Sequence, residues 1–599
     1  MTDKPIIQYP MPTKTLVDCA MGRIPADLVI QDGRWVCVQT GEIVEHMDIA
    51  VIFGKIAYVG PDASHTIGDG TQLIHAEGKF LVPGLLDAHV HVESSMLTVT
   101  EFVRAIISHG TTGIFIDPHE IANVFGLNGV KLMAEEAAVQ PIHVYVQVPS
   151  CIPSNPGYET PGAELGPVEV QEALAWEHVI GLGEVMDFPG VVASDEKMLS
   201  EIGLTIGAGK VVSGHYASAD LGLHFHGYAA GGAQDDHEST TTDDAIQRTR
   251  QGMKVMMRYG SGCQDVSQLS KAVTEHGCDS RGFLLCTDDS HSQTLINEGH
   301  MDRVVRHAID CCLSPMQAIQ MATINTAEHF KVSQQIGMIA PGRWADILLA
   351  SSLDDFSVEM VIAKGRVVSK AGQVLIDIPR YTYPDWALNS VHLSHPISAA
   401  DFAIKTSQMG NMMANVIGII ENQASTRHLQ LKVPIMSGEI KADFPRDLAK
   451  VALVERHRGA GVVTRGLVSG FGFSIPCAVA STVVHDCHQM IVVGTDDSNM
   501  ALAANTLANC GGGQVVVANG EISGLVDLPI GGLMSSESCQ IAARKVAKLL
   551  AGFQKCGCRL NNPNMQLSML GLVVIPDIRI SDKGIVDVTQ MKFINLVEE

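Results

Sequence analysis

The middle of the chain, from about residue 81 to residue 336, alternates short apolar runs with longer helix-like stretches. Eight runs recur there: FLVPGLLD, TGIFID, HVYVQV, VIGLGEV, KVVSGH, GGAQDDHE, KVMMRYG and GFLLCTDD. The sixth run is the weakest, because it is polar. Strand-like runs separated by helices are typical of parallel strand–helix units, and eight such units predict a (β/α)8 TIM-like barrel.

The two flanks of this region have a different pattern. Residues 26–60, and again the residues after 336, carry β-rich runs separated by turn sequences such as DG, TGE and FGK. This texture predicts antiparallel strands. We expect residues 1–80 and 337–394 to form one small β-sandwich domain, with the barrel, residues 81–336, inserted between its two parts.

A third region begins near residue 395. Strand-like runs (GQVVVANGEI, MLGLVVIPDIRI) mix there with helix-like runs (MALAANTLANC, IAARKVAKLL). We expect an additional α/β domain over residues 395–599. A chain of 599 residues is too long for a single core, which agrees with several domains.

Composition excludes some classes of partner. The formal net charge of −24 disfavours nucleic acid, because an acidic surface repels phosphate backbones. The start, MTDKPIIQYPMPTK, lacks the pattern of a secretion signal. The longest uncharged stretch, residues 466–484, is broken by Gly, Ser and Pro476, so we expect buried strands and no membrane span. Fourteen scattered cysteines lack zinc-ribbon spacing and favour free thiols in the cytoplasm.

Candidate chemistry starts from DAHVHVE, residues 87–93. His89 and His91 are two residues apart at a strand end, so their side chains point to the same side. Barrel active sites lie where the strands end, because the loops after the strands converge there. Polar residues at the ends of the runs are His89, His91, His119, Glu120, Glu184, His215, His237, Glu238, Asp288 and Asp289.

Six of these residues make a plausible set of metal ligands: His89, His91, Glu184, His215, His237 and Asp288. Imidazole nitrogen and carboxylate oxygen suit divalent Zn, Fe, Mn or Co, and six ligands suffice for two ions. Glu184 can bridge them because a carboxylate has two oxygens. A hydroxide held between two cations forms near neutral pH, and Asp288 could accept its proton and pass it to a leaving group.

Other polar residues have weaker claims. A single buried histidine is more often a hydrogen-bonded core residue than a ligand. His224 and His226 are also two residues apart, but they lie in a Gly/Ala-rich stretch that we expect to be helical. His485 and His488, in HDCHQ, could form an extra metal site, but packing or pocket lining is the favoured interpretation. Asp288 is preferred over Asp289 because it follows FLLCT most closely.

At these residues the chain resembles a known family. PGLLDAHVHVESSM is similar to the first-strand motif of the amidohydrolase superfamily, and its ESSM continuation resembles bacterial adenine deaminases. Further similar motifs are DPHEIANVFG, GLGEVMDFPG, DDHEST, LCTDD, ATINTAEHF, GMIAPGRWADILL and, in the C-terminal region, HDCHQMIVVGTDDSNMALAANTL, GGGQVVVANGEI and LPIGGLMS. The resemblance covers nearly the whole chain and implies an adenine-deaminase-type domain at its C-terminal end.

The resemblance implies hydrolysis of adenine to hypoxanthine and ammonia, as in purine salvage, by a metal-bridging hydroxide that attacks C6. It implies two divalent ions, Mn(II) or Fe(II), with Zn(II) also possible, held by the same six ligands. His119 and Glu120, in DPHE, would then lie near the purine base. Either Glu120 or Glu238 would protonate the ring.

Several alternatives stay open. A cyclic amidase of the same superfamily would bridge its metals with a carboxylated lysine, but the strand-four position is Glu184, and the nearest downstream lysine, Lys197, lies in a helical, polar setting. A paralogue could act on another 6-substituted purine or a cyclic amide. A non-catalytic barrel could only bind a purine. We expect a homo-oligomer, such as a dimer, because the extra domain offers surface.

Overall fold

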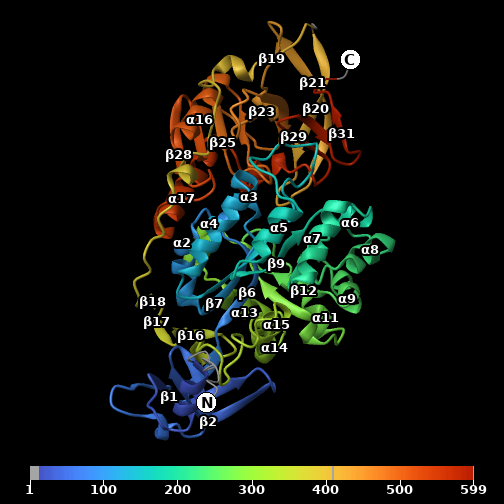
Figure 1. The fold of residues 1–599 in the computed structure, drawn as a ribbon. Coiled ribbons are helices and arrows are strands. Elements are labelled where there is room, and N and C mark those ends of the chain that lie inside the picture. The colour runs from blue at the N-terminus through green and yellow to red at the C-terminus, as the bar shows by residue number, and fades with distance from the viewer. Residues whose placement is uncertain (1–11, 408–409, 598–599) are drawn as a thin grey trace, which may run out of the picture.

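The computed structural model describes residues 12–407 and 410–597. The N-terminal residues that were interpreted as lacking a secretion signal therefore lie, up to residue 11, outside the described part. Figure 1 shows the barrel between two other bodies: the small β domain at one end and the C-terminal domain at the other. In the described ranges, no helix has the length and apolar character that a membrane span requires.

The barrel is confirmed, and each of the eight predicted runs contains a strand. The strands are β6 (Leu85–His91), β7 (Thr111–Ile116), β8 (His143–Val148), β9 (Val179–Val185), β10 (Val211–Gly214), β11 (Asp235–Asp236), β12 (Lys254–Arg258), β13 (Phe283–Cys286) and β14 (Asp288–Asp289). They form two parallel ladders, β10-β9-β8-β7-β6-β14 and β11-β12-β13. Strand β14 continues the run of β13, and the Gln234 N–H donates to the Val212 carbonyl at 2.9 Å, so the ladders join into one ring.

Two runs behave differently from the prediction. In FLVPGLLD, Phe80–Pro83 is strand β5 of the β domain, and the barrel strand starts only at Leu85. The sixth strand is two residues long and polar because its carboxylates serve neighbouring backbone groups. Asp235 accepts the Gly214 N–H at 3.0 Å, and Asp236 accepts the Tyr216 N–H at 2.7 Å.

Helices surround the strands (Figure 1). They are α2 (Val99–Ile106), α3 (His119–Phe125), α4 (Leu127–Ala138), α5 (Pro167–Leu174), α6 (Phe188–Val192), α7 (Glu196–Gly207), α8 (Leu223–Gly231), α9 (Thr242–Arg250), α10 (Val266–Leu269), α11 (Lys271–Thr274), α12 (Ser292–Asn297), α13 (Met301–Asp310), α14 (Pro315–Met321) and α15 (Ile324–His329). Helix α2 illustrates their construction. The Thr98 hydroxyl accepts the Glu101 N–H at its start, and Phe102, Val103 and Ile106 are buried.

The β domain joins both flanks of the barrel in one sheet of nine described strands. The first flank supplies β1 (Leu28–Cys37), β2 (Glu42–Ile52), β3 (Lys55–Gly60), β4 (Gln72–His75) and β5, after helix α1 (Pro12–Ala20), and the second supplies β15 (Ile347–Ser352), β16 (Ser357–Ala363), β17 (Arg366–Lys370) and β18 (Gln373–Val374). Strand β15 runs antiparallel to β5, with Leu348 opposite Val82. The predicted β domain built from both flanks is thus confirmed, although the DG at residues 32–33 is an irregularity inside β1 and not a turn.

The C-terminal domain contains ten strands of one sheet in the order β19-β22-β21-β20-β24-β23-β26-β25-β27-β28, and a small sheet β29-β30-β31. The strands are β19 (Ile404–Lys405), β20 (Asn411–Ile419), β21 (Thr426–Met436), β22 (Glu439–Ile440), β23 (Leu448–Val454), β24 (Val463–Ser469), β25 (Cys477–Ser481), β26 (Met490–Gly494), β27 (Gly513–Ala518), β28 (Glu521–Asp527), β29 (Ile578–Ser581), β30 (Gly584–Asp587) and β31 (Lys592–Ile594). The helices are α16 (Asp497–Asn509), α17 (Cys539–Lys555) and α18 (Pro563–Ser568). The mixed content confirms the predicted extra domain. Within MLGLVVIPDIRI, however, only the last residues form a strand, and residues 569–571 are a 3-10 turn.

The C-terminal domain and the barrel interlock. The loop after β8 reaches into the C-terminal domain, where the Asn155 side chain donates to the Val573 carbonyl at 2.8 Å. The Gln489 amide donates to the Thr160 carbonyl at 2.7 Å. One buried apolar cluster continues from Ile121 of α3 into the C-terminal domain. The domain therefore covers the face of the barrel where the strands end.

Candidate functional site

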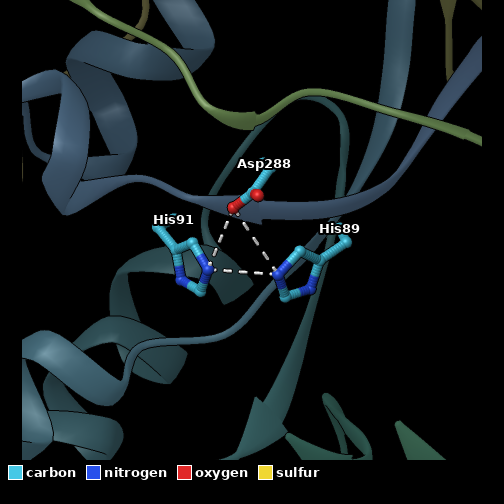
Figure 2. A group of neighbouring side chains, drawn as sticks. All are labelled: His89, His91 and Asp288. Carbon is cyan, nitrogen blue, oxygen red and sulfur yellow. Dashed lines mark hydrogen bonds and ion pairs between the residues drawn. The ribbon is translucent and has the colours of Figure 1, made fainter. Parts of the chain in front are cut away.

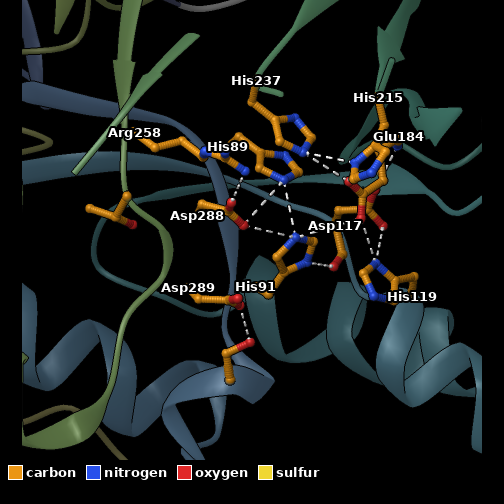
Figure 3. Close-up of polar contacts among 12 residues, drawn as sticks. His89, His91, Asp117, His119, Glu184, His215, His237, Arg258, Asp288 and Asp289 are labelled. Carbon is orange, nitrogen blue, oxygen red and sulfur yellow. Dashed lines mark hydrogen bonds and ion pairs between the residues drawn. The ribbon is translucent and has the colours of Figure 1, made fainter. Parts of the chain in front are cut away.

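The six predicted ligands come together at the C-terminal ends of the barrel strands (Figure 3). Five of them are buried, and the His215 side chain is 17% exposed. That they bind a metal remains a prediction, and the distances between their side-chain atoms bear on it.

The first group consists of His89, His91 and Asp288, which point toward one another in Figure 2. The two Nε2 atoms are 3.1 Å apart, and Asp288 Oδ1 lies 3.4 Å from His91 Nε2 and 4.0 Å from His89 Nε2. The pairing of β14 with β6 places Asp288 opposite Val90, between the two histidines. Three potential ligand atoms thus face one point.

Glu184 connects this group to a second one. Its Oε2 lies 2.8 Å from His215 Nδ1 and 3.0 Å from His237 Nε2, while Oε1 lies 3.6 Å from His91 Nε2. One carboxylate therefore reaches both groups with different oxygens, as a bridging ligand must.

The GLGEV sequence explains how Glu184 is held. Its backbone N–H donates to Asp117 Oδ2 at 2.8 Å. A Cβ atom at Gly183 would lie 2.3 Å from that same oxygen, so a larger residue there would displace Asp117. Glycine before Glu184 is thus required for the contact between β9 and Asp117, the residue that follows β7.

Hydrogen bonds behind the site orient the imidazoles. His91 Nδ1 lies 3.0 Å from the Asp117 carbonyl oxygen, and because only an N–H can make that contact, the Nε2 lone pair faces the site. Asp87 accepts two hydrogen bonds from Thr287, one from its backbone N–H at 3.0 Å and one from its hydroxyl. These bonds hold β6 against the end of β13. A histidine that donates one ring N–H to a backbone carbonyl and turns its other nitrogen toward the site, as His91 does, has the usual arrangement of a metal-binding histidine.

The buried carboxylates of the site stabilise positive charge on the histidines. Burial alone would lower the pKa of His237, but the hydrogen bond and charge of Glu184 and the charge of Asp288 raise it to about 9. Burial also opposes protonation of His119, yet Glu184 raises its pKa to about 10. Buried carboxylates that favour a cation this strongly are suited to a divalent metal ion, which would supply the same positive charge.

The proposed proton-transfer residues lie around this cluster. His119 and Glu120 begin helix α3, and His119 Nδ1 is 3.0 Å from Glu184 Oε1. Glu120 is 1% exposed, and its Oε1 accepts the Ser94 hydroxyl at 3.1 Å while Oε2 has no hydrogen-bond partner in the described structure. Glu238 differs, because it is paired with the guanidinium of Arg258.

Arg258 belongs to the site although its side chain was not predicted there. It ends β12, and besides Glu238 it contacts Asp288 Oδ2 at 3.2 Å and Asp265 at 2.9 Å. Asp117 and Asp289 also lie beside the cluster (Figure 3). Asp289 is one of the polar residues that end the predicted runs. Asp117 also ends a run, TGIFID, so the same criterion could have identified it.

The C-terminal domain supplies further side chains. His485 Nδ1 lies 3.9 Å from Glu120 Oε1 and 3.6 Å from Asp486 Oδ1. His485 thus lies beside Glu120, whereas His488 is fully buried and its Nδ1 accepts the Val484 N–H. Asp486 was missed, and no local pattern signals it.

His224, His226 and Lys197 lie on helices, as the sequence predicted. His224 and His226 lie on helix α8, and the His224 side chain is 62% exposed. Lys197 lies on α7, where its Nζ donates to the Ser150 carbonyl at 2.7 Å and pairs with Glu201. The Lys197 ammonium group thus has two protein partners on its own side of the barrel wall.

The site fits a divalent metal. In the described residues, potential ligand atoms lie within 4.8 Å of one another in the groups His89–His91–Asp288, His89–Glu184–His237 and His91–His119–Glu184. Nitrogen and carboxylate donors without thiolate suit Mn, Fe, Co or Zn. A metal ion held by such donors can activate a water molecule.

Comparisons with known proteins agree with this chemistry. A profile of the Amidohydrolase family matches residues 80–368, and a profile of the adenine deaminase C-terminal domain matches residues 423–592. An adenine deaminase of Mesorhizobium japonicum is 57% identical over 97% of this chain and 96% of its own length. Adenine deaminase 3 of Rhizobium meliloti is 55% identical over 96% and 97%, and an adenine deaminase of Moorella thermoacetica is 47% identical over 98% of each.

Proposed function

This chain belongs to the adenine deaminases of the amidohydrolase family, and from that membership we propose how its site works. The protein hydrolyses adenine to hypoxanthine and ammonia. The observation that carries this conclusion is identity above 50% over nearly the whole length of curated adenine deaminases, together with a buried His/Asp/Glu cluster at the barrel strand ends.

We propose that two divalent ions, Mn(II) or Fe(II), occupy the cluster, with Zn(II) as a further possibility. The ligands would be His89, His91, Glu184, His215, His237 and Asp288, with Glu184 between the two ions. The two oxygens of Glu184 that reach opposite groups support this assignment. When bound, the ions would supply Lewis acidity that lowers the pKa of a water molecule to near neutrality.

The chain's own residues then handle the protons. We assign to Asp288, whose Oδ1 lies 3.4 Å from His91 Nε2, the transfer of a proton from the attacking water to the departing amine. Attack at C6 ends the ring's aromaticity, so a ring nitrogen must gain a proton. Glu120 is our candidate donor, because its Oε2 has no partner in the described structure, whereas the Glu238 carboxylate is held by Arg258. His119 precedes Glu120 in helix α3, and its Nδ1 lies 3.0 Å from Glu184 Oε1.

The test is ammonia release from adenine by protein reconstituted with Mn(II), beside adenosine and dihydroorotate, with metal counted on the same sample. Turnover of adenine with about two metals per chain is expected. Two metals with no adenine turnover would favour a paralogue that acts on another 6-substituted purine or cyclic amide.

We also propose that the protein acts in the cytoplasm as a homodimer. Its fourteen cysteines are all free and nine are buried, as suits a reducing compartment. The C-terminal domain offers additional surface for self-association. Light scattering on the purified protein tests the dimer, and the mass of a single chain would contradict it.

A further inference from the structure

A loop of the C-terminal domain forms part of the wall of the active site. Residues 482–489 connect β25 to β26 and carry His485 and Asp486. As whole residues, these two are 8% and 2% exposed. The His119 side chain on the barrel offers a nitrogen within 4.8 Å of both. The barrel strand ends and this loop therefore meet at His119.

Two buried carboxylate oxygens in this wall lack partners. In the described residues, Asp486 Oδ2 and Glu120 Oε2 are buried without a hydrogen bond. An unpaired buried polar atom costs about 1–3 kcal/mol, so buried polar atoms are usually paired, and a bound ligand is one partner that could pair these two. His485 stands between them, 3.9 Å from Glu120 and 3.6 Å from Asp486.

The loop is held firmly from behind. The His485 N–H donates to the Ser568 carbonyl at 3.2 Å, and the His488 N–H donates to the Val484 carbonyl at 2.8 Å. The fully buried guanidinium of Arg456 donates to the His488 carbonyl. Asp486 is thus a pre-positioned group, as a residue that recognises a ligand must be.

Free adenine has the hydrogen-bonding groups that this wall requires. The reacting C6 must face the metal cluster, so the opposite side of the purine faces the C-terminal domain. The ring nitrogen farthest from C6 is N9, which carries a hydrogen in the free base and a sugar in the nucleoside. A carboxylate opposite N9 would accept that N–H and leave no room or partner for a substituted nitrogen.

Resting on the proposed function, we propose that Asp486 of the C-terminal domain accepts the N9–H of adenine and thereby selects the free base against N9-substituted purines. Sites built to pair a substrate N–H discriminate strongly against analogues that lack it, because the buried acceptor is left unpaired. Asp486 is then a specificity-determining residue that acts in binding and takes no part in proton transfer at C6.

The test compares adenine with 9-methyladenine in the wild type, Asp486→Ala and a matched control, Asp497→Ala. Asp497 lies in the same domain, where its carboxylate pairs with Lys450 at 2.7 Å, away from the site. All proteins are loaded with Mn(II), and kcat/KM is measured by ammonia release. Where 9-methyladenine turns over too slowly, its inhibition constant replaces kcat/KM.

We expect the adenine to 9-methyladenine preference to fall by about 10–100-fold in Asp486→Ala, since a hydrogen bond to a charged group is lost for adenine alone. Asp497→Ala should keep the wild-type preference. Asp486→Asn, which preserves the shape, should lower the preference by about 3–10-fold and keeps the test valid if the alanine variant does not fold.

Three results would overturn the proposal. The first is an unchanged preference in a folded Asp486→Ala protein. The second is equal use of both purines by the wild type. The third is loss of a metal equivalent in Asp486→Ala, which would make the group His119–His485–Asp486 a metal site. By contrast, a wild type with bound metal that releases no ammonia from adenine would contradict the proposed function itself.

Discussion

Arg456 offers a strong test of how the C-terminal domain supports the site. It is fully buried, and its guanidinium donates four hydrogen bonds, to the carbonyl oxygens of Ser390, His488 and Gly531 and to the Ser390 hydroxyl. Burial lowers the pKa of Arg456 to about 9, which reflects the cost of enclosing a charge there. The carbonyl of His488 belongs to the loop that carries His485 and Asp486.

The substitution Arg456→Met leaves four buried acceptors without this donor, each at a cost of about 1–3 kcal/mol. Methionine recovers part of this sum, because enclosing the guanidinium itself costs several kcal/mol. We therefore expect a net destabilisation of about 3–5 kcal/mol. For a domain of 150–250 residues, about 2–4 °C per kcal/mol converts this into a fall in apparent Tm of about 6–20 °C.

The assay is scanning calorimetry at a fixed scan rate, paired with adenine kinetics at 25 °C. We expect KM for adenine to rise in Arg456→Met, since the loop loses its support. Arg579→Met is the matched control. Arg579 is equally buried, but it donates to the carbonyls of Met569, Ile575, Ala424 and Pro576, all outside the loop. Its substitution should therefore lower Tm and leave KM near the wild-type value. A Tm for Arg456→Met within 2 °C of the wild type would refute the reasoning.

Further predictions concern the cluster and its surroundings. Glu184→Gln and Asp288→Asn should each fold with an unchanged circular dichroism spectrum and lose at least about 100-fold in kcat, since the bridge or the proton acceptor is lost; full activity in either variant would contradict these roles. His485→Ala should retain the wild-type metal content by mass spectrometry, and loss of one equivalent would make it a ligand. Chelation should abolish ammonia release and Mn(II) should restore it, whereas turnover by metal-free protein would exclude the proposed chemistry. Burial, with a contribution from the charge of Asp486, raises the pKa of Glu159 to about 7 from its ordinary 4.5. Between these pH values the folded protein holds a proton that the unfolded chain lacks, so stability falls as pH rises, and Glu159→Gln should show a smaller fall in Tm from pH 5 to 7.5 than the wild type; parallel curves would refute this.

The barrel was predictable because its strands are buried on both faces and therefore read as apolar runs. The polar residues that end those runs were predictable because parallel strands bring their C-terminal ends to one face of the barrel. The pattern could not separate β5 from β6 within FLVPGLLD, because both are apolar and only their partners differ. The pattern also predicted too long a strand in MLGLVVIPDIRI, because an apolar run without periodicity does not distinguish a strand from a turn.

The contribution of the C-terminal domain was largely hidden. Glu120 and His485 lie 3.9 Å apart in space, yet 365 positions separate them along the chain. No local pattern records such a contact. Arg258 was missed for another reason: a single arginine at the end of KVMMRYG has the ordinary appearance of a strand end, and only the three carboxylates around it identify its role.

The sheet shared by the two flanks of the barrel has a consequence for biosynthesis. Strand β5 leaves the ribosome early, but β15, its antiparallel neighbour, follows about 260 residues later. At about 5–20 residues per second, that interval lasts about 13–50 s. During this time β5 has an open edge, which is a template for pairing with other nascent chains. The domain that is translated first is thus completed only after the barrel, and a chain that stalls inside the barrel is left with an unprotected strand near its beginning.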